Sequence, residues 1–430
     1  MKRHRIPRKV FDALAGGSGG AHAVGYLQVA QYSRRLLLLR GVRDAARAEE
    51  PKRARRARQA FALLAEIQEL APEAVETTIR YPTVGAWARD VLVGRGDTGG
   101  LAALAAAAAV RAGFPRPIEV PASDGVVVLP SLGRAILPDC NSAVVRPGVA
   151  RVTAAHGVSV RIPTDPYRDA PGWQGLRRME AEYHGMAIRL LLDEGDPYRM
   201  PGTEVAQTRL SPAELESWRA GMRRAWRLLV RFHWTAAEEV AAAISVVSPL
   251  VPHGKEHTSA TAHHTFGGIG LSLPPDDHAF AVALAHEVQH TKLGALMDLV
   301  PLTRPDDGSR HYAPWRDDPR PINGLLHGAY AHLGVAGYWR RQRAHERGAT
   351  MMRAHMEFAR WRDAAALAAH TLAASGRLTD AGEIFVAEMA RTLRAWRREP
   401  VPKVALDHAR TAAVRHRARW HLRNGMDPAG

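Results

Sequence analysis

The spacing of apolar residues divides the chain into three regions, residues 1–116, 117–202 and 203–430. In the first region, Leu and Ala recur with Arg at spacings of three and four from residue 32 to residue 70. This is the period of an amphipathic helix. We therefore predict that residues 1–116 form a helical N-terminal region.

In the second region, short β-type runs replace the helical period. Residues 126–129, 143–145 and 158–162 are rich in Val and are separated by Gly, Pro and Asp. This pattern is typical of antiparallel hairpins. We predict a small β-rich subdomain here, and we interpret residues 163–202 as a connector to the third region.

The third region returns to helical patterns and contains two further predicted strands, at 244–247 and 267–273. Ser211, Pro212 and Glu214 have the spacing of a capping box and predict the start of a helix. An apolar, helix-forming run covers 279–297, and residues 321–424 are almost entirely helical in pattern. The predicted fold class is therefore α+β: mostly helical, with a small antiparallel sheet subdomain.

The helix predicted at 279–297 carries an H-E-x-x-H motif, formed by His286, Glu287 and His290. Two histidines four residues apart lie on one helix face, so both imidazoles can reach one metal ion. The glutamate between them can act on a bound water or substrate. A strand packed beside this helix would complete a zincin-like arrangement, because a strand edge can hold an extended peptide. The alternative is a pair of core histidines satisfied by hydrogen bonds.

A catalytic metal needs a third protein ligand, and the next predicted helix offers His327 and His332. These residues are about 140° apart around a helix, so they cannot both face the metal squarely. We favour His327 and keep His332 as the alternative metal ligand. His327 shares a stripe with small residues that would let the metal helix approach closely: Gly324, Ala331 and Gly334. Further candidates are His257, His263, His264 and His311.

A proline-spaced loop at 310–321 joins the two helices and carries Arg316 and Arg320. Arginine forks bind carboxylates in a bidentate manner, so these side chains are candidates for binding a carboxylate of a ligand. The alternative is that they pair with Asp317 and Asp318 and only fix the loop.

Composition narrows the compartment and the partners. The 430 residues carry a formal net charge of +16 and one cysteine, Cys140, which excludes an intrachain disulfide and a thiolate metal cluster. No apolar run is long enough to span a bilayer and no secretory signal is recognisable, so we expect a cytoplasmic protein with no membrane partner. The positive charge suits an acidic peptide. It comes without a nucleic-acid-binding signature, so no nucleic-acid partner is expected.

The chain resembles the HExxH-motif peptide-modification proteins of bacterial clusters for peptide natural products. The matching segments span nearly the whole chain. They are His4-Arg5-Ile6-Pro7, Phe11-Asp12-Ala13-Leu14, Gly85-Ala86-Trp87, Leu271-Ser272-Leu273-Pro274, the segment 286–293, Leu299-Val300-Pro301-Leu302, the loop 312–321 and Gly324-Leu325-Leu326-His327-Gly328.

The resemblance implies a 2-oxoglutarate-dependent dioxygenase that β-hydroxylates a ribosomally synthesised precursor peptide (RiPP biosynthesis). A radical-SAM peptide-modifying enzyme from the same cluster is then an expected partner. The implied metal is Fe(II), with 2-oxoglutarate and O2 as cosubstrates. His286, His290 and His327 would hold the iron.

The same resemblance implies roles for the residues around the metal. The distal carboxylate of 2-oxoglutarate needs a cation, which Arg316, Arg320 or Lys292 would supply. Glu287 would orient the substrate or a ligand and would not serve as a base.

The motif alone also fits a zinc metallopeptidase, with Zn(II) as the metal. In that case Glu287 is the general base for a zinc-bound water. A third hypothesis is a binding protein with a degenerate site that retains no metal.

Overall fold

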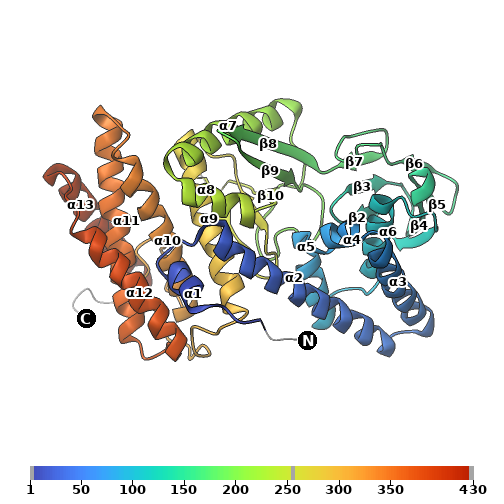
Figure 1. The fold of residues 1–430 in the computed structure, drawn as a ribbon, viewed down its shortest axis with the longest axis horizontal. Coiled ribbons are helices and arrows are strands. Elements are labelled where there is room, and N and C mark those ends of the chain that lie inside the picture. The colour runs from blue at the N-terminus through green and yellow to red at the C-terminus, as the bar shows by residue number, and fades with distance from the viewer. Residues whose placement is uncertain (1–3, 253–256, 426–430) are drawn as a thin grey trace.

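A computed structural model describes residues 4–252 and 257–425 of the chain. Figure 1 shows an elongated molecule, with the C-terminal helices at one end and most of the short strands at the other. The long helices of residues 212–342 and a sheet lie between these ends. The α+β class predicted from the sequence is confirmed.

Helices make up most of the described residues. They are α1 (Arg8–Ala15), α2 (Gly20–Ala45), α3 (Pro51–Leu70), α4 (Pro72–Ile79), α5 (Pro82–Leu92), α6 (Gly100–Ala112), α7 (Pro212–Phe232), α8 (Trp234–Ala243), α9 (Asp277–Met297), α10 (Ile322–Gln342), α11 (Gly348–Ala374), α12 (Asp380–Arg397) and α13 (Lys403–Asn424), with short 3-10 turns at Ala46–Ala48 and Pro147–Val149.

The strands are β1 (Ile118–Pro121), β2 (Val126–Leu129), β3 (Gly133–Ile136), β4 (Ser142–Arg146), β5 (Arg151–Ala154), β6 (Ser159–Arg161), β7 (Trp173–Gly175), β8 (Arg177–Tyr183), β9 (Met186–Leu192), β10 (Val246–Pro249), β11 (Ser259–Ala260) and β12 (Gly268–Leu271). Two antiparallel sheets have the strand orders β1-β4-β5-β6 and β2-β3-β7. A five-stranded sheet has the order β11-β12-β10-β9-β8 and is mixed, because β10 runs parallel to both β9 and β12.

Several local predictions are confirmed. The predicted run at 126–129 is strand β2, and the run at 279–297 lies within α9. Ser211 caps α7 in a complete capping box, in which its side chain accepts from the backbone N–H of Glu214 and the Glu214 carboxylate accepts from the N–H of Ser211. Asp276 caps α9 by accepting from the N–H of Ala279.

The predicted boundaries between regions are not the boundaries of the packed cores. Residues 163–202 are not only a connector, because β8 and β9 within them form one hairpin of the five-stranded sheet. This sheet therefore crosses the predicted boundary at 202. The boundary at 116 is crossed as well, since one hydrophobic core runs from Leu39 of α2 through α3–α6 to Trp173 of β7. Phe11 and Leu14 of α1 instead pack in a core with residues of α9, α10 and α12.

None of the helices in residues 4–252 and 257–425 combines the length and the apolar character needed to cross a bilayer.

At two positions, glycine allows a helix to pack closely against its neighbour. A Cβ at Gly334 of α10 would lie 3.0 Å from the carbonyl oxygen of Ala285 and 2.6 Å from Cγ of Gln289, both on α9. The close approach predicted for this stripe is therefore present at Gly334. A Cβ at Gly85 of α5 would lie 2.3 Å from the carbonyl oxygen of His264, so α5 packs directly against the loop before β12.

We predict that Gly85→Ala destabilises the protein by about 1–3 kcal/mol, since the clash is with backbone and cannot be relieved by a rotamer change. The matched control is Gly25→Ala in the second turn of α2, where a Cβ meets nothing of the described chain within 4 Å. This variant should be stabilised by about 0.5–1 kcal/mol. Denaturant unfolding measures both, and equal effects of the two variants would contradict the packing of α5 described above.

Candidate metal centre

The two motif histidines point at one another from the same face of α9. Nε2 of His286 and Nε2 of His290 are 3.1 Å apart, and the rings meet edge to face. Two nitrogen ligands at about 2.1 Å from one ion lie about 3.0 Å apart at a right angle and about 3.4 Å apart at a tetrahedral angle. The observed separation lies between these values, so the pair fits two neighbouring positions around one metal.

Both imidazoles are held in the form that binds metals. Burial lowers the pKa of His286, and burial together with the neighbouring His286, His327 and His332 lowers the pKa of His290 well below its usual range. A metal-binding imidazole must be unprotonated. The surroundings of α9 therefore keep the pair neutral at physiological pH.

Glu287 lies beside this pair and is fully buried. Its Oε2 accepts a hydrogen bond of 2.6 Å from the hydroxyl of Thr261, which follows strand β11. Its Oε1 is buried without a hydrogen-bond partner among residues 4–252 and 257–425, and it lies 3.8 Å from Nε2 of His286. A buried carboxylate oxygen without a partner is costly, so this atom points to a donor or cation that completes the site.

Helix α10 brings two further imidazoles to the same place. The ring of His327 stacks on that of His290 at 5.8 Å between centroids, and the ring of His332 meets that of His286 edge to face at 5.2 Å. Nδ1 of His332 bonds the carbonyl oxygen of Gly328 at 2.8 Å, which leaves its Nε2 for another partner. Trp315 and Trp361 cover His332, at 4.4 and 4.6 Å between ring centroids. The two α10 histidines thus both approach the motif, which their angular separation on the helix argued against.

The third metal position is not formed as the side chains stand. Among the described residues, no three His, Cys, Asp or Glu side chains are grouped so that they could hold a metal ion. The donor set nevertheless fits a divalent ion, because two neutral imidazoles already have the separation of neighbouring ligands. The ring contacts of His327 with His290 and of His332 with His286 make these two imidazoles the candidates for the third bond.

The four histidines line a cavity of about 790 Å³. Its wall also contains Ser259, Ala260 and Thr261, from the edge strand β11 and the residue after it, and the two indoles next to His332. The cavity is large enough for a small cosubstrate together with part of a peptide, since ligand pockets range from about 300 to 1,000 Å³.

Arg316 and Arg320 also line this cavity. Both donate to Asp318, from Nε of Arg316 at 2.7 Å and from Nη1 of Arg320 at 2.9 Å. Burial raises the pKa of Asp318, but these two hydrogen bonds outweigh it and the pKa is lowered. The loop-fixing role considered from the sequence is therefore present for Asp318, and both arginines remain at the cavity. Asp317 pairs with Arg423 of α13 instead.

The structure does not bring Lys292 into the cavity, contrary to its predicted role at the cosubstrate. Lys292 follows His290 by two residues, about 200° around the helix, so it leaves α9 on the opposite face. Its Nζ lies 2.6 Å from Oε2 of Glu239 in α8, and both side chains are buried. Oε1 of Glu239 accepts from the N–H of Gly20 at the start of α2. Lys292 therefore ties three helices together.

A polar cluster on the cavity wall was not predicted as a unit. Nδ1 of His263 lies 2.9 Å from Nε2 of His264, whose Nδ1 lies 2.6 Å from Arg34. Asp298, at the end of α9, accepts from Gln31 of α2 at 2.8 Å and lies 3.7 Å from Nε2 of His263. The position of His263 and His264 before a predicted strand was the only sequence signal. Their contacts with α2 depend on the tertiary fold.

Comparison with known proteins does not identify the chain. No protein-family model and no curated protein matches it. The chemistry of the site therefore rests on the residues themselves.

We predict that the purified chain binds one divalent ion, and that His286→Ala and His290→Ala each weaken Zn(II) or anaerobic Fe(II) binding by about 100-fold or more. His278→Ala is the matched control. His278 also lies on α9, but its side chain bonds the hydroxyl of Tyr338 and does not line the cavity. Isothermal titration measures all three. Unchanged affinity in the two motif variants would contradict the metal centre.

The same titration separates the two α10 histidines. If His327 supplies the third donor, His327→Ala loses more affinity than His332→Ala. The reverse order would assign the third position to His332.

We predict that Lys292→Met destabilises the protein by about 3–5 kcal/mol, because it leaves the Glu239 carboxylate buried without its cation. The double variant Lys292→Met/Glu239→Gln should recover part of this loss, since Gln keeps an acceptor for Gly20. Guanidinium unfolding measures both. A stable Lys292→Met protein with weakened 2-oxoglutarate binding would instead place Lys292 at the cavity.

Proposed function

We propose that the protein is an Fe(II)- and 2-oxoglutarate-dependent dioxygenase that hydroxylates Cβ of a residue in a ribosomally synthesised precursor peptide. The observation that carries the proposal is the His286–His290 pair, with Nε2 atoms 3.1 Å apart, at a cavity that Arg316 and Arg320 also line. The resemblance to the HExxH peptide-modification proteins selects this chemistry among those that a two-histidine site allows.

In this proposal His286, His290 and His327 hold Fe(II), with His332 as the alternative third ligand. Non-haem iron oxygenases typically use two histidines and one carboxylate as protein ligands, so an imidazole of α10 would here take the place of the carboxylate. Fe(II), when bound, supplies the activation of O2 that is coupled to the oxidative decarboxylation of 2-oxoglutarate to succinate.

Arg316 and Arg320 would bind the distal carboxylate of 2-oxoglutarate. Both guanidinium groups already converge on one carboxylate, that of Asp318. One carboxylate of a bound dicarboxylate could accept hydrogen bonds from both guanidinium groups, which present several donors in fixed planes. Arg316 and Asp318 are about half exposed, so their ion pair is weak and a ligand carboxylate can replace Asp318.

The peptide substrate would lie along β11 in a zincin-like manner. Strand β11 is the edge of the five-stranded sheet, and it packs next to α9. An extended peptide can add to such an edge through main-chain hydrogen bonds. Glu287 Oε1, which has no hydrogen-bond partner in the described part of the chain, would then orient the peptide by accepting from one of its N–H groups.

A zinc metallopeptidase is the second candidate, and the same Glu287 oxygen favours it. The atom lies 3.8 Å from Nε2 of His286, near enough to the metal position to serve as a general base for the attacking water. The peptidase hypothesis leaves the two cavity arginines without a role in the reaction.

We predict that anaerobically Fe(II)-loaded protein, given O2, 2-oxoglutarate and the precursor peptide, forms succinate and adds the mass of one oxygen atom to the peptide. Zn(II) should inhibit the reaction. Arg316→Ala and Arg320→Ala should raise KM for 2-oxoglutarate, while Arg310→Ala should not. Arg310 belongs to the same loop but pairs with Asp306. Mass spectrometry of the peptide and a succinate assay measure these outcomes.

Peptide cleavage in the absence of 2-oxoglutarate would replace this proposal by the peptidase. A protein that retains no metal, and that His286→Ala changes only in stability, would support the third hypothesis, a binding protein with a degenerate site.

A further inference from the structure

A second cavity of about 680 Å³ lies where α3, α5 and α6 meet β1 and β2. None of the residues that line it belongs to the lining of the metal cavity. The chemistry proposed above makes no use of it. Its wall is built from two strands whose inner edges face each other.

These strands diverge from one hairpin. Ser123 and Val126 exchange two backbone hydrogen bonds, of 3.0 and 2.9 Å, across a two-residue turn. Beyond this pair the strands separate, since β1 pairs with β4 in one sheet and β2 pairs with β3 in another. The result is a fork that is closed at residues 123–126, and residues of both arms line the cavity.

The backbone of β2 presents hydrogen-bonding groups to the inside of the fork. Val126 of β2 lies opposite Ile136 of β3. Ile136 donates its N–H to the carbonyl oxygen of Gly172, and Val126 exchanges its backbone hydrogen bonds with Ser123, on the side of the fork. Because backbone direction alternates along a strand, Val128 also directs its N–H and C=O away from β3, into the fork.

The arm formed by β1 has the same property. Ala122 donates to Asn141 on the side of β4, so Val120 faces β4 as well. Glu119 and Pro121 then face the fork. Pro121 has no N–H to leave unpaired, which suits an inner-edge position. An extended chain placed between the arms therefore meets the N–H of Glu119 and of Val128 and the carbonyls of both arms.

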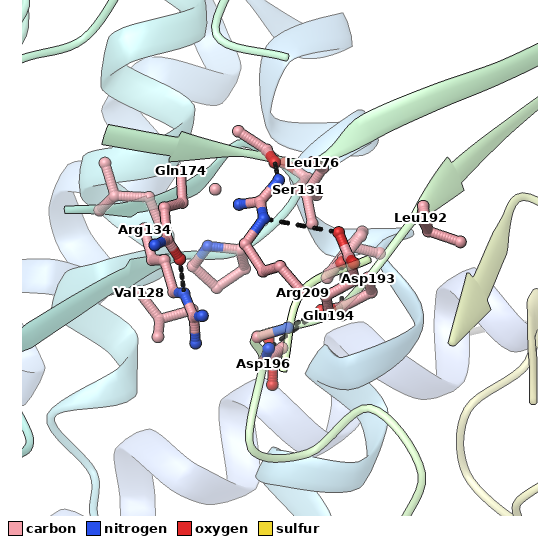
Figure 2. Close-up of a pocket in the computed structure, with 16 residues that line it drawn as sticks. Val128, Ser131, Arg134, Gln174, Leu176, Leu192, Asp193, Glu194, Asp196 and Arg209 are labelled. Atoms are coloured by element: carbon pink, nitrogen blue, oxygen red, sulfur yellow. Dashed lines mark hydrogen bonds and ion pairs between the residues drawn. The ribbon is translucent and has the colours of Figure 1, made fainter. Parts of the chain in front are cut away.

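The walls of the fork are fixed by ion pairs and hydrogen bonds beside it. Figure 2 shows a small adjoining pocket, in which Arg134 of β3 bonds the side chain of Gln174 at 2.7 Å. In the same view Arg209 pairs with Glu194 at 3.6 Å. Arg134 and Asp196 also line the fork cavity. Because β3 pairs with β2, the Arg134–Gln174 bond supports the β2 arm from the side away from the fork.

The charge around the fork favours an acidic ligand. Helix α3 has an exposed run of basic residues: Lys52, Arg53, Arg55, Arg56 and Arg58. Arg53 and Arg56 line the cavity and pair with Asp97 at 3.6 Å and Glu119 at 2.9 Å. Exposed pairs of this kind contribute little, so the arginines can exchange these partners for a ligand carboxylate.

The acidic side chains in the wall, Asp97, Glu119, Asp124 and Asp196, balance the basic ones that line it, Arg53, Arg56 and Arg134, so the excess positive charge lies on the other exposed residues of α3 beside the cavity. Burial, together with the carboxylate of Asp193, raises the pKa of Asp196 to about 7, so Asp196 is only partly ionised at neutral pH. Asp124 lies at the closed tip of the fork.

We propose that the fork is a second peptide-binding site, which takes an extended acidic segment as an added strand between β1 and β2. The identification of that segment as part of the precursor peptide rests on the proposed function, whereas the binding itself does not. Main-chain pairing accepts many sequences, as recognition of a conserved part of a variable substrate requires.

The two cavities lie on opposite sides of α5. Gly85 contacts the carbonyl of His264, a residue of the metal cavity, while Thr83 and Trp87 line the fork cavity. A helix is about 10–12 Å across. An extended linker of on the order of ten residues would therefore let one peptide occupy both sites.

The test uses the metal-free full chain and a fluorescein-labelled octapeptide of alternating Glu and Val as the probe, with anisotropy as the readout. We expect saturable binding that Arg53→Glu/Arg56→Glu weakens by about tenfold. The matched control is Arg55→Glu/Arg58→Glu, which makes the same charge change on residues of α3 outside the cavity lining. Equal weakening by the two double variants would mean nonspecific attraction and overturn the proposal.

A second measurement tests the added strand directly. Bound probe should slow hydrogen exchange of the amides of Glu119 and Val128, and a probe with N-methyl groups at alternate residues should bind at least about tenfold more weakly. Protection at residues 259–261 instead would place the peptide only at β11. A short single-stranded DNA that shows the same variant dependence would make the fork a nucleic-acid groove. Either result would overturn the proposal, and neither depends on whether the protein is a hydroxylase.

Discussion

The close approach of α9 and α10 is the constraint on which the candidate site depends. At Gly334 the two helices are so near that a Cβ would lie 3.0 Å from the Ala285 carbonyl oxygen. Histidines from both helices therefore reach one cavity, two from the H-E-x-x-H motif and two from α10. A side chain at position 334 would push α10 away, and the metal position would keep only the motif pair.

Contacts on the other faces of α9 hold the helix in place, so that the face with His286 and His290 stays at the cavity. The buried Lys292–Glu239 pair joins α9 to α8, and Glu239 also accepts from the first N–H of α2. Gln289 donates to the carbonyl of Gly17, between α1 and α2. Polar residues on the other faces of α9 thus position the face that carries His286 and His290. Desolvation by the same packing keeps the imidazoles unprotonated, which is the form that a metal requires.

The sequence predicted the parts of this arrangement that depend on local spacing. The helical motif, the capping box at Ser211, the strand at Val126–Leu129 and the small residue at position 334 all follow from patterns within a few residues. Two errors were avoidable. Met179 and Ala181 alternate with Glu180 and Glu182, a period of two that indicates strand β8. The position of Lys292, two residues after His290, already places it on the far face of the helix.

Other features depend on contacts that no local pattern encodes. Strand β9 pairs with β10 across more than fifty residues of chain, so the mixed sheet and its passage across residue 202 could not be predicted. Which imidazole would be the third metal ligand depends on how the rings of His327 and His332 are oriented. Gly328, Trp315 and Trp361 restrain the ring of His332. His263 and His264 reach the cavity wall through a loop in which His264 has a positive φ of 70°.

The central claim is that imidazoles of α9 and α10 together hold one divalent ion. X-ray absorption at the iron edge of the anaerobic Fe(II)-loaded protein tests it most directly, because imidazole ligands give characteristic multiple scattering. We expect three histidine nitrogens at about 2.1 Å, with one fewer when the α10 ligand is replaced by Ala. A spectrum with only oxygen ligands, or with no more than the two motif histidines in the unaltered protein, would contradict it.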